Sequence, residues 1–97
     1  MIVVSGTVTA RPETLDELLA AALDHVRRSR TEPGCLQHGV AIDAETPLTL
    51  VFYEEWADRA ALDAHFQVPG SLTFMQAVRS LAASQTRMKI LPVETRD

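Results

Sequence analysis

A histidine late in a short amphipathic segment is the strongest candidate for chemistry in this sequence. His65 follows Ala61 and Leu62 on the apolar side of a predicted helix, so its imidazole is expected to point into the space between helix and sheet. An imidazole titrates near neutral pH, which suits it to act as a general base or hydrogen-bond partner. A partly exposed histidine without a chemical role is the alternative.

A carboxylate and two aromatic rings share one face of the strand before that helix. Side chains two positions apart in a strand point the same way, so Glu54 looks where Phe52 and Trp56 look. Burial among rings would raise the pKa of the Glu54 carboxyl, and such a group could hold a histidine or a substrate hydroxyl. A structural ion pair is the alternative for Glu54, and a core position at the strand end is the alternative for Trp56.

The other reactive residue types lack partners nearby in the sequence. Cys35 follows a Pro-Gly turn with no close histidine to activate it, so packing as a small apolar side chain is favoured over a nucleophilic role. His25, His38 and His65 show no short metal-ligand spacing, so any metal site would depend entirely on folding, and we predict none. The glycines are dispersed, and nucleotide or flavin binding has no local signal.

Hydrophobic spacing predicts seven elements in the order βαββααβ. Asp58 is expected to cap the second helix, and the segment Val68-Pro69-Gly70 separates that helix from the third. The predicted strands are 1–9, 35–42, 48–56 and 85–93, and the predicted helices are 14–30, 59–66 and 71–82.

This order predicts an α+β, ferredoxin-like unit, with an antiparallel sheet and helices on one face, in a single domain over residues 1–97. The strand 48–56 is apolar on both faces over its first six residues, so the sheet needs two covers. Helices of the same chain provide one cover. A second copy of the sheet is the simplest other cover, so we expect a homodimer through the open sheet face.

Composition excludes several classes of function. Thirteen acidic against nine basic side chains give a formal charge of −4, so nucleic-acid binding is not expected. The sequence has no basic leader and no apolar run long enough for a membrane helix, so we expect a cytoplasmic protein without a membrane part.

Three short motifs, in this order and spacing, resemble the antibiotic biosynthesis monooxygenase family. They are the E-P-G-C-L sequence of residues 32–36, the Y-E-E-W sequence of 53–56 and the A-A-L-D-A-H-F sequence of 60–66. The resemblance implies a small dimeric α+β barrel. It also implies, by analogy with the best understood members, oxygenation of hydroxyarenes, anthrones or quinols by molecular oxygen without flavin or metal.

That chemistry requires the protein to bind, desolvate and deprotonate an electron-rich phenol, which supplies its own electrons. On the resemblance, we expect no cofactor, and we expect a small aromatic substrate and oxygen as partners. The residues expected to suffice are His65 as base, Glu54 as anchor for the hydroxyl, and Phe52, Trp56, Phe66 and Phe74 as walls.

The sequence departs from the family pattern at two places. Many relatives have a second histidine just after the proline that follows the helix, where this chain has Gly70. The positions that the family pattern implies for haem degradation hold residues 5–7 and 72–77, which contain neither the expected Asn nor a histidine. An isomerase of a small hydroxy-carbonyl metabolite, or a non-catalytic ligand-binding dimer, is the alternative, and convergence of Arg79 and Arg87 on a pocket would favour an anionic metabolite.

Overall fold

The computed structural model describes residues 1–94; residues 95–97 lie outside the described part. The elements follow the order β1, α1, β2, β3, α2, α3, β4 and β5. The strands are β1 (Ile2–Ala10), β2 (Cys35–Ile42), β3 (Thr49–Trp56), β4 (Ala82–Gln85) and β5 (Lys89–Pro92), and the helices are α1 (Leu15–Ser29), α2 (Arg59–Gln67) and α3 (Pro69–Leu81).

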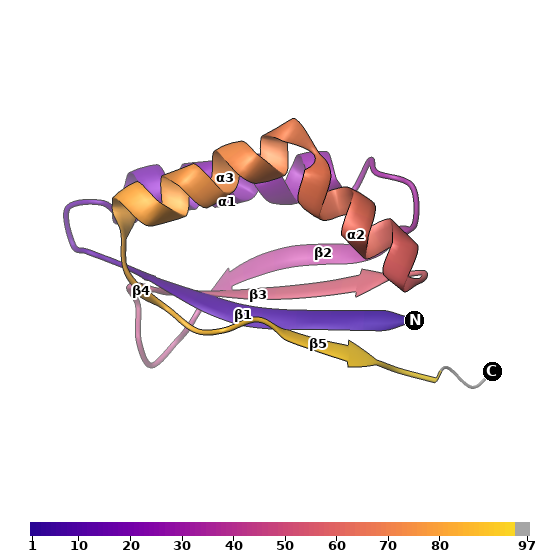
Figure 1. Ribbon diagram of the computed structural model, residues 1–97. Coiled ribbons are helices and arrows are strands. Elements are labelled where there is room, and N and C mark those ends of the chain that lie inside the picture. The colour runs from indigo at the N-terminus through magenta and orange to yellow at the C-terminus, as the bar shows by residue number, and fades with distance from the viewer. Residues whose placement is uncertain (95–97) are drawn as a thin grey trace.

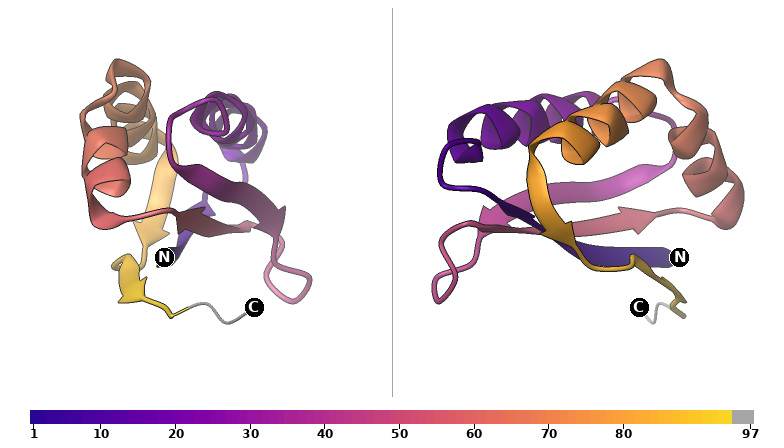
Figure 2. Two further views of the ribbon diagram at one scale, coloured as in Figure 1. Left: turned by 90° about the vertical axis from the view of Figure 1, so that its right-hand side faces the viewer. Right: turned by 60° about the vertical axis from the view of Figure 1, so that its left-hand side comes forward.

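One antiparallel sheet contains all five strands, in the order β2-β3-β1 with two short strands on the outer edge of β1. Strand β4 pairs with the end of β1 around Val8–Ala10, and β5 pairs with its beginning at Ile2–Ser5. The three helices cover one face of this sheet, and α2 descends toward the sheet at one end (Figures 1 and 2). The predicted α+β, ferredoxin-like class is confirmed.

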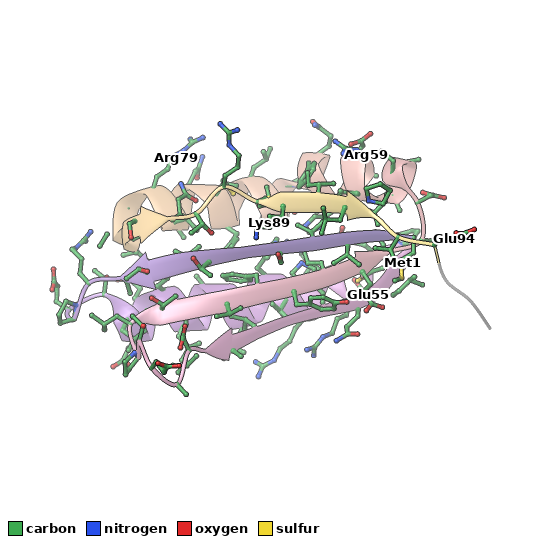
Figure 3. All side chains as sticks on the ribbon, turned by 90° about the horizontal axis from the view of Figure 1, so that it is seen from below. Met1, Glu55, Arg59, Arg79, Lys89 and Glu94 are labelled. Carbon is green, nitrogen blue, oxygen red and sulfur yellow. The ribbon has the colours of Figure 1, made fainter. Side chains whose placement is uncertain are left out.

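The opposite face of the sheet carries no helix of residues 1–94 (Figure 3). Because side chains alternate along a strand, the neighbours of buried Val4 and Phe52 point to this open face. Apolar and polar side chains are mixed there: Val3, Ala41, Val51, Tyr53 and Leu91 alternate with Ser5, Thr7, Thr9, Glu55 and Lys89.

Two predicted boundaries were wrong. The predicted strand 85–93 is two strands, because Thr86 leaves the regular pairing: its hydroxyl accepts the Thr7 N–H at 2.9 Å and its own N–H bonds to the Thr7 carbonyl at 3.0 Å. Helix α3 begins at Pro69 rather than Ser71. Proline suits the first position of a helix, where its missing N–H is not needed.

Two apolar clusters fill the space between helices and sheet. The larger joins α1 and α3 to β1 and β3, and the smaller joins Val4, Trp56 and Leu62 beneath α2. The larger cluster consists of Val8, Ala10, Leu18, Ala22, Val26, Leu50, Phe52, Phe74 and Val78.

The turn before β2 is fastened to the start of α2. Gly34 has φ +83°, a left-handed conformation that glycine adopts without a Cβ penalty, and an added Cβ would lie 2.5 Å from the Cβ of Ala61. The Gly34 carbonyl also accepts the Ala57 N–H at 2.8 Å. Residues Glu32–Gly34 are therefore held against α2, which carries His65.

Candidate functional site

A pocket of about 230 Å³ lies between the helices and the strands β1 and β3. Most of its lining is apolar, while the histidines His25 and His65 and the carboxylate of Glu54 supply polar groups. The remaining lining residues are Val4, Gly6, Thr7, Val8, Phe52, Phe66, Ser71, Phe74, Met75, Val78, Gln85, Thr86 and Met88.

His65 is buried, with 3% of its surface exposed, and a carboxylate fixes its ring. Nδ1 of His65 lies 2.8 Å from Oε1 of Glu32, whose side chain is 12% exposed. An ionised carboxylate only accepts hydrogen bonds, so Nδ1 carries the hydrogen and Nε2 keeps its lone pair. The turn that holds Glu32 against α2 thus sets the tautomer of the candidate base.

Glu54 is buried on the helix side of β3 and contacts two donors. Trp56 Nε1 donates to Oε1 of Glu54 at 2.9 Å, and His38 Nε2 lies 3.4 Å from the same oxygen. Burial alone would raise the pKa of Glu54, as expected from the sequence, but His38 and Trp56 together outweigh it and the pKa is lowered. The expected direction of the pKa shift was wrong because the sequence does not show these donors. With a lowered pKa, Glu54 is a carboxylate anion at neutral pH.

Trp56 does not line the pocket, contrary to the expectation that it forms a wall. The indole is fully buried behind His65, with ring centroids 4.6 Å apart at an angle of 36°. Its polar edge holds Glu54, and its flat side supports the imidazole. Trp56 therefore belongs to the support of the site rather than to its surface.

The three other aromatic residues predicted as walls, Phe52, Phe66 and Phe74, do line the pocket. Arg79 and Arg87 are absent from the lining found among residues 1–94. Tyr53, on the other face of β3, donates its hydroxyl to Glu55 at 2.6 Å and takes no part in the pocket.

His25 reaches the same pocket from α1. Its ring stacks on Phe74 with centroids 4.4 Å apart and 12° between planes, and Arg28 donates to its Nδ1 at 2.7 Å. A guanidinium only donates, so Nδ1 holds the lone pair and Nε2 the hydrogen. Burial, followed by the neighbouring His38, His65 and Arg28, lowers the pKa of His25 to about 3, so this ring is neutral at pH 7.

Folding brings together the three histidines that the sequence leaves far apart. One ligand nitrogen from each of His25, His38 and His65 lies within 4.8 Å of the others, although the residues come from α1, β2 and α2. His38 is 1% exposed. Its Nδ1 has no hydrogen-bond partner among the described residues, and its Nε2 has only the 3.4 Å contact with Glu54. An unpaired buried polar atom destabilises the folded protein by about 1–3 kcal/mol. A ligand that bound to Nδ1 would remove that destabilisation.

Sequence reasoning missed Glu32 as a site residue. The signal was present in the E-P-G motif, where a carboxylate directly precedes a turn that requires glycine. That motif indicates a turn and contributes to the family resemblance, but nothing in the sequence shows that the turn docks on the helix that carries His65.

None of the helices in residues 1–94 is long and apolar enough to cross a membrane.

Comparison with known sequences gives a family and two relatives. The sequence model of the family described as Antibiotic biosynthesis monooxygenase matches residues 1–77. "Uncharacterized protein sll1783" of Synechocystis sp. is 34% identical over 92 residues, which are 95% of this chain. The chain spans 63% of the length of that relative. "Putative monooxygenase YcnE" of Bacillus subtilis is 35% identical over 72 residues, 69% of this chain and 76% of YcnE.

Solved structures match nearly the whole chain. A Deinococcus radiodurans protein described as "a putative antibiotic biosynthesis monooxygenase" superposes with a TM-score of 0.93 at 22% identity, covering 100% of this chain and 96% of that one. Rv0793 of Mycobacterium tuberculosis superposes with a TM-score of 0.88 at 25% identity, covering 99% and 98%. At such identities the likeness establishes the fold and leaves the chemistry to the site.

Proposed function

This chain belongs to the antibiotic biosynthesis monooxygenase family, and from that premise we propose that it oxidises a quinol-like or phenolic substrate with molecular oxygen. The observation that carries the proposal is His65, which the Glu32 carboxylate orients inside an apolar pocket. A monooxygenase-like function also agrees with the name of the Bacillus relative.

The pocket favours an uncharged aromatic ring over an anionic metabolite. Its walls include three phenylalanines, and neither Arg79 nor Arg87 reaches it within the described chain. An engineered cavity of about 150 Å³ holds one benzene ring, so 230 Å³ suits a substituted single ring or two fused rings. The larger polycyclic substrates that the family resemblance implies would need more room.

The protein's part in the reaction is to remove a proton from the substrate hydroxyl. Nε2 of His65 takes this proton, and the imidazolium that forms is stabilised by Glu32 at the other ring nitrogen. Glu54, as an anion, accepts a hydrogen bond from a second polar group of the substrate. The apolar walls exclude water, so the phenolate remains electron-rich.

The remaining steps belong to substrate and oxygen. The phenolate passes one electron to oxygen, and the resulting superoxide and phenoxyl radical combine at a ring carbon that still carries hydrogen. The peroxide takes the proton back from His65, the ring C–H bond and the O–O bond break, and a quinone and one water leave. Phenol and one oxygen molecule thus give quinone and water, and these reaction steps require no bound flavin.

We also propose that the chain works as a homodimer through the open sheet face. On that face Val3 pairs with Leu91, and Val51 and Tyr53 pair with the short polar side chains of Thr7 and Ser5, which allows close contact between two sheets. Sedimentation at micromolar concentration is expected to give a dimer. A monodisperse monomer would contradict this part of the proposal.

Oxygen uptake by EDTA-treated protein tests the proposed reaction. The substrates are naphthols and naphthohydroquinones, and anthrones serve as the larger ring systems that the pocket volume disfavours. The rate of uncatalysed autoxidation is subtracted. We expect saturable, protein-dependent uptake, and at least about a tenfold fall in turnover for His65→Asn, given what a positioned base contributes. The matched control is Glu55→Gln, which removes a carboxylate on the other sheet face. Uptake that does not exceed background with any substrate would refute the proposal.

A further inference from the structure

We propose that His25, His38 and His65 together bind one divalent transition-metal ion at the inner end of the pocket. The cluster draws on α1, β2 and α2, and one nitrogen from each ring lies within 4.8 Å of the other two. Neutral imidazole is a preferred ligand of zinc, copper, nickel and iron. The three rings are also all of the histidines in the chain.

The orphaned ring of His38 is the observation that points to a ligand. It is 1% exposed, and its centroid lies 5.2 Å and 5.5 Å from those of His25 and His65. Its Nδ1 has no hydrogen-bond partner among the described residues, while its Nε2 has only the 3.4 Å contact with Glu54. Buried polar groups in native proteins are normally paired. A metal ion bound to Nδ1 would account for the burial of this unpaired nitrogen.

Two of the three rings already have the carboxylate partner that metal-binding histidines usually have. Glu32 holds Nδ1–H of His65 and leaves Nε2 free, while Glu54 lies 3.4 Å from Nε2 of His38 and leaves Nδ1 free. In each ring one nitrogen therefore faces a carboxylate and the other keeps a lone pair. The two carboxylates also balance the charge of a divalent ion.

His25 needs one local change. Arg28 donates to Nδ1 of His25, so Nε2 carries the hydrogen and cannot ligate until Arg28 leaves. Arg28 has other partners within reach, because Ser71 Oγ lies 3.5 Å and Glu32 Oε2 3.8 Å from its guanidinium nitrogens. Metal binding is thus coupled to the position of this arginine, and removing its guanidinium should strengthen binding.

The rings must also close slightly around an ion. Bonds of about 2.1 Å in tetrahedral geometry put ligand nitrogens about 3.4 Å apart, so no pair has to close by more than about 1.4 Å. Side-chain rotations in a site that borders a pocket supply such a movement. The pocket side of the ion then remains open to water or another small ligand.

The ion and the proposed reaction exclude each other, and this consequence rests on the proposed function. Both use the lone pair on Nε2 of His65, so a metal-loaded protein lacks its base. The metal ion is therefore an inhibitor of the metal-free oxygenation, whereas the binding site itself does not depend on that activity.

Metal titration of the protein without a histidine tag tests the site. Protein stripped with EDTA is titrated with Co²⁺ and Zn²⁺ by calorimetry, and Cu²⁺ is followed by electron paramagnetic resonance. We expect one ion per chain and hyperfine coupling to several imidazole nitrogens, which only this cluster supplies. His38→Ala should weaken binding by at least about tenfold, since even outer-shell changes cost that much. Arg28→Gln should tighten it.

Control variants distinguish specific binding at the three histidines from an adventitious ion bound elsewhere. Cys35→Ser removes the one thiol and should leave the affinity unchanged. Circular dichroism establishes that each variant is folded, and His25→Asn replaces His38→Ala if the latter is not. Affinity within twofold of the parent for a folded histidine variant, or coupling to a single nitrogen, would overturn the site. If Zn²⁺ binds but does not slow a measured oxygen uptake, the proposed inhibition is refuted and the proposed binding site is not.

Discussion

Glu32→Gln removes the negative charge beside His65 while it keeps the side-chain shape. Hydrogen bonds to charged groups contribute about 1.5–3 kcal/mol and neutral ones about 0.5–1.5, and Glu32 is only 12% exposed, so solvent screens the pair little. The imidazolium that forms when His65 takes a proton therefore loses about 1–2 kcal/mol of stabilisation. Because 1.4 kcal/mol corresponds to a factor of ten, kcat should fall about tenfold.

Two measurements separate this role from loss of structure. Steady-state oxygen uptake should show a lower kcat with KM changed less than twofold, because Glu32 does not line the pocket. Long-range ¹⁵N–¹H spectra should show His65 with hydrogen on Nδ1 in the parent and a mixture of tautomers in the variant. An unchanged kcat together with an unchanged tautomer would refute the argument that Glu32 orients His65.

Three further predictions concern the support of the site. Gly34→Ala should destabilise the protein by about 1–3 kcal/mol in urea unfolding, because Gly34 has a positive φ and its new Cβ would clash with Ala61. The control Gly39→Ala should change the free energy of unfolding by less than about 0.5 kcal/mol, because no atom lies within 4 Å of the added Cβ. Trp56→Phe should cost about 1–3 kcal/mol because Glu54 loses its 2.9 Å donor, and an unchanged urea midpoint would contradict that. Burial, with Glu32 and Glu54 nearby, raises the pKa of Cys35, so less of its thiolate forms at a given pH. Iodoacetamide at pH 8 should therefore alkylate Cys35 more slowly than free cysteine, and an equal rate would contradict this prediction.

Local patterns predicted the frame of the molecule. The alternation around Phe52 and the helical spacing around Leu18 depend only on neighbours in sequence, and both positions are buried where expected. Asp58 was predicted as a helix cap, and its side chain accepts the Ala61 N–H at 2.8 Å. The last strand was harder, because pairing of Thr86 with Thr7 spans 79 residues and leaves no local pattern.

The site depends on contacts between elements, and local patterns do not contain those. His65 and Glu54 reach the predicted pocket because each follows the periodicity of its own element. The contact of Glu32 with His65 and the convergence of His25 with His38 depend instead on how α1, β2 and α2 meet. Trp56 was placed on the correct face, but periodicity does not distinguish a residue that lines a pocket from one that supports it.

The interrupted edge strand separates two properties of the pocket. Gln85, Thr86 and Met88 form one wall and lie beyond residue 77, where the family match ends, while His65, Glu32 and Glu54 lie within it. Substitutions at the break between β4 and β5 can therefore change the shape of the pocket without changing the groups that move a proton. In evolutionary terms, this one wall can diverge while the proton-transfer groups are retained, whereas Phe52, Phe66 and Phe74 are encoded among those groups within residues 1–77.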